Sequence, residues 1–141
     1  MIIKQLSVFL ENRAGRLTEV TEVLSENNIN ISALSIAETA DYGVLRMIVD
    51  NPEKAVGAMK KSDLSVHITD VIAIVTPDTP GALNKVIKYL SEVEINVSYM
   101  YGYSHENKAS IIMKVDNPKK AVEILQSKKV ELLSASQFYK I

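Results

Sequence analysis

Two short turns hold the residues with the most evident chemistry. They read Glu-Asn-Arg-Ala-Gly-Arg-Leu at residues 11–17 and Pro-Asp-Thr-Pro-Gly-Ala-Leu at residues 77–83. A glycine there lets the backbone approach a ligand closely, and the N-terminus of a following helix suits a carboxylate. Asp78 could hold an ammonium group, and Asn12 could do so through its neutral carbonyl, so the turns suit an α-amino acid. Alternatively, the glycines only shape the turns, and Asp78 or Thr79 only caps a helix.

The sequence offers little that could carry catalysis. His67 and His105 are isolated and fall at unrelated positions, as surface or packing histidines usually do. There is no cysteine, which excludes disulfides, thiolate metal sites and cysteine nucleophiles. No spacing supplies the three or four ligands of a metal site, and no glycine-rich phosphate loop is present. We therefore expect no catalytic residue, no metal, no cofactor and no enzymatic activity.

Charge argues against a nucleic-acid partner. The 141 residues include 16 Lys and Arg and 17 Asp and Glu, a net charge of -1, whereas nucleic-acid binding needs clustered positive charge. Tyr99, Tyr101 and Tyr103 share one face of a predicted strand, but no basic residue is interleaved with them. We expect them to form a homodimer contact or part of a ligand pocket.

A membrane location is also not expected. The longest unbroken aliphatic run, residues 71–75, is far shorter than the roughly 20 residues that cross a bilayer. The first residues show no basic region leading into an apolar stretch. The expected location is the cytoplasm.

The elements that must position the two turns occur twice in the chain. The sequence aligns with itself without a gap at an offset of 66 residues. Of the 42 positions from Gly15 to Val56, 17 are identical to the residue 66 places later. Chance would give about one match in seventeen for average composition. A shared block is Asp-Asn-Pro, at residues 50–52 and 116–118. The sequence therefore predicts an internal duplication.

Each copy begins with a strand and a helix. Apolar and polar residues alternate over 6–10, which indicates a half-buried strand. Apolar residues then recur at helical spacing over 17–24 and over 83–90. We expect Thr79 and Pro80 to open the second of these helices as its N-cap and first residue.

The rest of each copy predicts two strands, a helix and a strand. In the first copy the strands cover 29–38 and 42–50, Asn27-Asn28 ends the preceding helix, and Pro52 begins the next one. Alternation over 64–68 indicates the fourth strand.

The predicted order is βαββαβ, over 1–69 and again over 70–141, with only Thr69-Asp70 between the fourth strand and the next. This α+β order is typical of a ferredoxin-like sandwich, in which two helices cover one face of an antiparallel four-stranded sheet. Units of this size bury little surface alone, so we expect their sheets to join edge to edge.

The same residues carry a family resemblance. Asn-Arg-Ala-Gly-Arg-Leu at 12–17 and Asp-Thr-Pro-Gly-Ala-Leu at 78–83 resemble the D/N-x-P-G-x-L turn of ACT domains. Asn-Ile-Asn-Ile at 28–31 and Glu-Ile-Asn-Val at 94–97 resemble the entry to their second strand. The resemblance covers both copies and implies two ACT-like domains, 1–69 and 70–141. It also implies that their antiparallel sheets join side by side into one eight-stranded sheet with helices on one face.

Two ligand sites at that joint are implied by the resemblance. One would use Asn12, Arg13, Ala14, Gly15, Arg16 and Leu17, facing Asn96 and Val97. The other would use Asp78, Thr79, Pro80, Gly81, Ala82 and Leu83, facing Asn30 and Ile31. Backbone N–H groups near the two glycines would bind the carboxylate of the ligand, and the two asparagine carboxamides its other polar groups. The first turn departs from the pattern at Ala14, where proline is usual, and at Asn12, where Asp is frequent.

The implied function is that of a small-molecule regulatory protein. It would bind a free amino acid, form a homodimer and act allosterically in trans on an enzyme of amino-acid metabolism. One alternative is a regulatory subunit of a biosynthetic enzyme, such as the small subunit of acetolactate synthase, which the first copy resembles. Another is a ligand-free assembly module in which both glycine turns are only structural.

Overall fold

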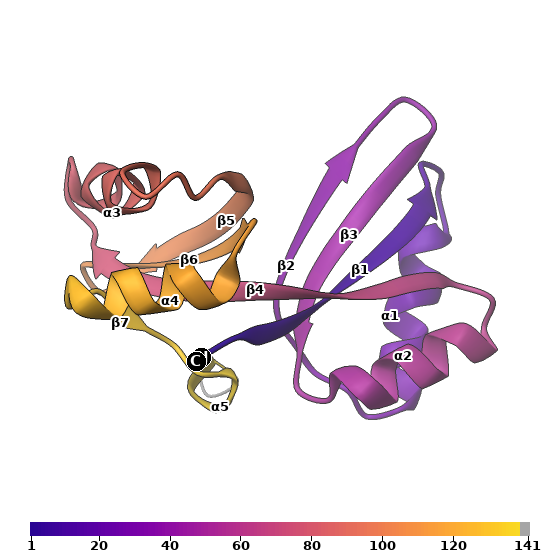
Figure 1. Ribbon diagram of the computed structural model, residues 1–141. Coiled ribbons are helices and arrows are strands. Elements are labelled where there is room, and N and C mark those ends of the chain that lie inside the picture. Colours follow the sequence, from indigo (N-terminus) through magenta and orange to yellow (C-terminus); the bar gives the residue numbers. More distant parts are fainter. Residues whose placement is uncertain (139–141) are drawn as a thin grey trace. The chain divides into compact units, whose positions relative to one another are not determined.

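The computed structural model describes residues 1–138, which divide into two compact units (Figure 1). Among the described residues, the N-terminal unit comprises Lys4–Thr69, and the C-terminal unit comprises Met1–Ile3 together with residues 70–138. The domain limits 1–69 and 70–141 stay a prediction, and residues 139–141 lie outside the described residues. No helix in residues 1–138 has the length and apolar character needed to span a membrane.

The N-terminal unit shows the expected βαββαβ order. Its elements are β1 (Ile3–Glu11), α1 (Arg16–Glu26), β2 (Ile31–Glu38), β3 (Tyr42–Val49), α2 (Pro52–Lys61) and the first part of β4 (Ser65–Pro77). The strands follow one another in the order β2-β3-β1-β4. β1 and β2 both pair with β3 in antiparallel register, for example Val8 with Leu45.

The C-terminal unit repeats this arrangement. It contains the second part of β4, then α3 (Ala82–Ser91), β5 (Val97–His105), β6 (Lys108–Val115), α4 (Pro118–Ser127), β7 (Glu131–Leu132) and the short α5 (Ala135–Phe138). β4 pairs with β6 and with β7, and β5 pairs with β6, all antiparallel. The α+β class and the order of elements predicted for both copies are therefore confirmed.

Seven strands are present in residues 1–138, so the predicted eight-stranded sheet is not confirmed. The expected fourth strand of the first copy and the first strand of the second are one continuous strand, β4. Residues 65–76 contain neither glycine nor proline and are rich in β-branched side chains, which favour extended backbone. Thr69-Asp70 therefore lies inside a strand and does not separate two.

In each unit the two main helices lie side by side on one face of the sheet (Figure 1). The N-terminal core combines strand and helix residues: Leu6, Val8, Leu10, Val20, Leu24, Leu45, Met47, Val49, Ala55 and Met59. The C-terminal core has the matching set Ile72, Ile74, Val86, Leu90, Ile111, Met113, Val115, Ala121 and Leu125. Burying each of the larger side chains stabilises the fold by about 1.5–3 kcal/mol, so the helix-facing side of each sheet supplies most of the packing energy.

The second helix of each unit begins as predicted. Asn51 and Asn117 are the N-caps, and their side chains accept hydrogen bonds from the backbone N–H of Lys54 and Lys120, both at 3.2 Å. A proline follows as the first helical residue in both copies. The repeated Asp-Asn-Pro block is therefore a strand end followed by a helix start.

The first helix of the second copy does not begin as predicted. Gly81, with φ of 87°, is the N-cap of α3, and Thr79 and Pro80 lie in the preceding turn. The equivalent Gly15 has φ of 93° and is the N-cap of α1. The chain changes direction at the left-handed glycine, and helical geometry begins only at the next residue. The capping preference of threonine is therefore overridden.

Further left-handed residues recur at matching places after the helices. Asn28 follows α1 with φ of 56°, and Glu94 follows α3 with φ of 59°. Asp63 follows α2 with φ of 57°, and Lys129 follows α4 with φ of 60°. Each lies in the short segment that leads from a helix into the next strand. The backbone shape is thus the same in the two copies although the residue types differ.

Two alanine substitutions test the packing of this fold. An added Cβ at Gly102 would clash with the backbone oxygen of Ser110 across the β5–β6 pair, whereas at Gly57, inside α2, it would meet nothing within 4 Å. Gly102→Ala should lower the free energy of unfolding by about 1–3 kcal/mol. Gly57→Ala should raise it by about 0.5–1 kcal/mol, because alanine favours the helix. Urea denaturation measures both, and equal effects would contradict the register of β5 against β6.

Candidate functional site

The two glycine turns have the same backbone geometry and open surroundings. Gly15 (φ 93°, ψ -22°) and Gly81 (φ 87°, ψ -13°) are both left-handed, and neither helix start has a side-chain cap. A Cβ built on either glycine would meet nothing within 4 Å. Glycine is therefore needed because the backbone angle is positive, since a Cβ at either position would meet no neighbouring atom. The open space lets a ligand atom approach the N-terminus of each helix.

Asp78 and Thr79 do not cap α3, which removes one of the alternative interpretations of this turn. The backbone N–H of Asp78 donates to the carbonyl of Asn107 at 2.9 Å, and the carbonyl of Thr79 accepts from the N–H of Ala82 at 3.2 Å. These bonds hold the turn through its backbone. Asp78 is exposed, so the C-terminal turn presents a carboxylate close to the open start of a helix.

Asn12, at the equivalent place in the N-terminal turn, has a structural role. Its backbone N–H donates to the carbonyl of Asp41 at 2.9 Å. Its Nδ2 donates to Oε2 of Glu38 at 3.3 Å and to the carbonyl of Ala40 at 3.4 Å. The carboxamide thus ties the turn to the β2–β3 hairpin, and a carboxylate here would instead face that of Glu38.

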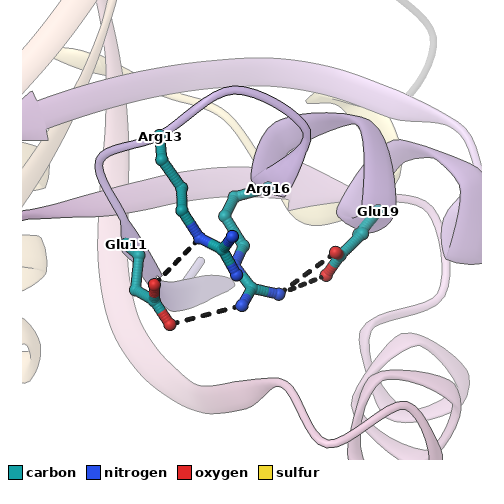
Figure 2. A network of polar contacts seen from close by, with 4 residues as sticks. All are labelled: Glu11, Arg13, Arg16 and Glu19. Carbon is teal, nitrogen blue, oxygen red and sulfur yellow. Dashed lines mark hydrogen bonds and ion pairs between the residues drawn. The ribbon is translucent and has the colours of Figure 1, made fainter.

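The two arginines of the N-terminal turn are engaged by acidic neighbours (Figure 2). Arg13 Nε lies 2.9 Å from Glu11 Oε2, and Arg16 Nη2 lies 3.3 Å from Glu11 Oε1. Arg16 Nη1 also contacts Glu19, at 2.8 Å from Oε2 and 3.1 Å from Oε1. Arg16 Nε is buried and has no hydrogen-bond partner among residues 1–138. These side chains cover part of the start of α1 with the protein's own charges.

Asn30 and Asn96 are positioned by aspartates that the sequence analysis did not single out. The backbone N–H of Asn30 donates to Asp50 Oδ1 at 3.1 Å, and that of Asn96 donates to Asp116 Oδ1 at 3.2 Å. The N–H of each aspartate returns a bond to the carbonyl of its asparagine at 3.2 Å. Both asparagines are exposed. The repeated Asp-Asn-Pro block was the available signal for this pairing.

A cavity of about 460 Å³ lies beside Asn30 in the N-terminal unit. Ile31 and Asp50 also line it, together with residues from the second half of α1 and from the segment that follows this helix. The structure thus brings two predicted site residues together with a carboxylate. None of the lining residues comes from the turn 12–17. The predicted combinations of each turn with the second strand of the other copy stay predictions, as do the roles of Arg13, Ala14, Leu17, Leu83 and Val97.

The three tyrosines lie on the edge strand of the C-terminal sheet. Tyr101 stands opposite Ile112 and Tyr103 opposite Ser110, in the register that places Ile111 and Met113 in the core. The tyrosines therefore face away from the helices. Tyr99 and Tyr101 are half-buried, and Tyr103 is 42% exposed. A contact or pocket role for this face stays a prediction.

The histidines are not gathered into a reactive cluster. The His67 ring meets that of Phe9 edge-on, with 5.7 Å between centroids. His105, the last residue of β5, is exposed, and its Nε2 lies 3.7 Å from Glu106 Oε1. Within residues 1–138, no group of three or more His, Asp or Glu side chains is placed to hold a metal ion.

Known proteins resemble this chain over its whole length. The family model for the ACT domain pair matches residues 1–141. No curated protein matches the chain significantly. A crystal structure of a protein from Bacteroides thetaiotaomicron is 52% identical, covering 100% of this chain and 98% of that chain, with a TM-score of 0.95.

More distant structures share the fold. The ligand-free regulatory subunit of aspartate kinase from Thermus thermophilus is 14% identical over 88% of this chain and 91% of that chain, with a TM-score of 0.66. The corresponding subunit from Thermus flavus is 13% identical over 90% and 94%, with a TM-score of 0.61. At this identity the likeness concerns the fold alone.

The left-handed glycines can be tested by their tolerance for other residues. Any side chain at Gly81 costs about 1–2 kcal/mol in backbone strain, but asparagine accepts this region better than a β-branched residue does. The free energy of unfolding should therefore fall in the order wild type, Gly81→Asn, Gly81→Val, as measured by circular dichroism in urea. Gly15→Asn and Gly15→Val provide the matched pair. Equal stability of the Asn and Val variants would contradict the backbone angle.

Proposed function

Because this chain belongs to the ACT domain pair family, we propose that it is a regulatory protein that binds a free amino acid. Binding changes its interaction with a separate enzyme of amino-acid metabolism. The same fold serves a regulatory subunit of aspartate kinase in Thermus thermophilus, which is consistent with a role outside catalysis. In this proposal the ligand is an amino acid, the regulated enzyme is a separate protein, and this chain has no catalytic activity.

One observation supports the proposal above all others. In both units an open, left-handed glycine stands directly before the N-terminus of a helix. Unpaired N–H groups and the positive end of the helix dipole favour an anion at such a place. The carboxylate common to all amino acids meets that requirement, and the side chain of the ligand would point away from the helix N-terminus.

The C-terminal turn is the better ligand site of the two. Asp78 offers an exposed carboxylate for the ammonium group of the ligand, and Pro80 stiffens the turn. In the N-terminal turn Asn12 bonds Glu38, and Arg16 bonds Glu11 and Glu19. We therefore propose that the turn around Gly81 binds first and more tightly.

The second half of each site is proposed on the second strands. Asn30 and Ile31, or Asn96 and Val97, would complete a site when one ACT unit meets another along this strand. The backbone of each asparagine is held by its aspartate, which fixes the point on the strand from which the exposed carboxamide would reach a ligand. Side-by-side pairing of two four-stranded sheets in this way would also give the expected eight strands.

Ligand binding would act through the relative arrangement of ACT units. A molecule that bridges two units stabilises the arrangement in which it binds, and a partner that recognises this arrangement responds to the ligand. Such coupling typically amounts to about 1–3 kcal/mol, a change of roughly 5- to 150-fold in the affinity of the partner.

A homodimer is part of the proposal. β2 has β3 as its hydrogen-bonded neighbour and stands at the end of the strand order, so one of its edges can accept another strand. Leu34 and Ile36 on this strand are 53% and 50% exposed. Apolar side chains on an open strand edge are typical of a surface that pairs with another chain.

Amino-acid binding can be tested by thermal shift with each of the twenty amino acids. A ligand at one hundred times its dissociation constant should raise the free energy of unfolding by about 2.7 kcal/mol. Asp78→Asn should weaken that ligand at least tenfold, because a charge-assisted hydrogen bond contributes about 1.5–3 kcal/mol. Asp63→Asn makes the same change at an exposed position outside the turn and should leave the affinity unaltered. The absence of a shift with every amino acid would overturn the proposal.

The dimer can be tested by sedimentation equilibrium. Ile36→Lys places a charge on the edge of β2 and should raise the dimer dissociation constant at least tenfold, since burying an unpaired charge is costly. Tyr42→Lys introduces the same charge at a residue that is 60% exposed and should leave the dimer intact. A monomeric wild-type protein at all concentrations, or equal weakening by both variants, would contradict pairing through β2.

A further inference from the structure

A second cavity, of about 560 Å³, lies within the C-terminal unit. It is formed between the end of β4, the first two turns of α3, the start of β6 and the segment that follows α4. We propose that this cavity is a separate binding site for a small organic anion with an apolar body. The cavity borders the glycine turn, from which Pro77 and Ala82 line it, but none of residues 78–81 does. The inference therefore does not depend on amino-acid binding at that turn.

The equivalent place in the N-terminal unit holds an ion-pair network. Arg16 extends between Glu11 and Glu19 there, with contacts of 3.3 and 2.8 Å (Figure 2). Sixty-six residues later, these three positions hold other residues. They are Ala82 for Arg16, Pro77 for Glu11 and Lys85 for Glu19. All three of these replacements line the cavity. The small side chain of Ala82 thus stands where the other copy has a guanidinium.

The charge of the surroundings has changed as well. Four lysines line the cavity, and each stands where the other copy has an acidic or neutral residue. They are Lys85 for Glu19, Lys108 for Tyr42, Lys128 for Ser62 and Lys129 for Asp63. Glu106 and Glu131 are the acidic residues of the lining, so positive charge is in excess. A site that in one copy encloses its own cation between carboxylates has become one that attracts an anion.

The cavity also has an apolar wall. Val86 is buried, Tyr89 and Val130 are half-buried, and all three line the space. The Lys128 ammonium lies 5.5 Å from the centre of the Tyr89 ring, a cation–π contact that holds this charge beside the aromatic surface. Lysines at the mouth and an apolar wall behind them suit a ligand with one charged end and one hydrocarbon end. The volume is within the range of about 300–1,000 Å³ that is usual for small-molecule sites.

Benzoate and phenyl phosphate are suitable probes, because each joins an aromatic ring to one anionic group, and benzamide is their neutral counterpart. In titrations of the full chain followed by amide NMR, both anions should shift resonances of residues 82–89 and 128–131 saturably. Benzamide should bind at least tenfold more weakly. The ratio of the two anion affinities distinguishes a carboxylate ligand from a phosphate ester. Equal binding of benzamide, no saturable shift, or shifts confined to other residues would overturn the proposal.

Variants of the lining provide a second test. Lys85→Glu reverses one charge and should weaken benzoate at least tenfold. Combined with Ala82→Arg, it restores the ion pair seen between Arg16 and Glu19 and should abolish binding while the unit stays folded. Lys119→Glu, on an exposed residue of α4 outside the cavity, is the matched control and should leave benzoate affinity unaltered. Benzoate binding that survives the double variant would overturn the proposal, whatever the outcome of the amino-acid screen.

Discussion

A positive φ at one glycine in each unit is the constraint on which the rest of the fold depends. At Gly15 and Gly81 the chain leaves a central strand and enters a helix within five residues. With φ near +90° the helix starts immediately and its apolar side meets the sheet. Any other residue there would carry backbone strain. The same angle leaves the helix N-terminus without a side-chain cap and open, so one local conformation serves both the packing of the unit and the anion binding that we propose there.

The two copies preserve their backbone framework while their surfaces diverge. The asparagine N-caps at 51 and 117 and the aspartates at 50 and 116 make the same bonds in both units, at nearly the same distances. The side chains around the glycine turns differ almost completely, from the Arg16 network to the lysine-lined cavity beside Ala82. The side chains that make these backbone bonds are the same in both copies, whereas side chains around the turns differ in charge.

Much of this architecture could be predicted from the sequence. The gapless repeat and the periodicity of the apolar residues gave the order of the elements, and Asn51-Pro52 gave a correct helix start. Thr79 was wrongly assigned as a cap because local preference was considered without the left-handed glycine that follows it. The continuous strand through Thr69-Asp70 differs from the prediction, which placed a boundary between the two copies there, although the lack of glycine and proline over 65–76 favours an unbroken strand. The cavity depends on contacts between α3, β6 and the segment after α4, which lie far apart in the sequence and leave no local pattern.

The left-handed residues that follow the helices differ between the two halves in how well they tolerate that conformation. Asn28 and Asp63 suit that conformation, whereas Glu94 and Lys129 occupy it with side chains for which it is unfavourable. Lys129 is also one of the four lysines of the C-terminal cavity. The strained backbone at Lys129 lowers the free energy of unfolding, while its ammonium adds positive charge to the cavity. In the N-terminal half the equivalent of Lys129 is Asp63, which tolerates the conformation better and carries the opposite charge.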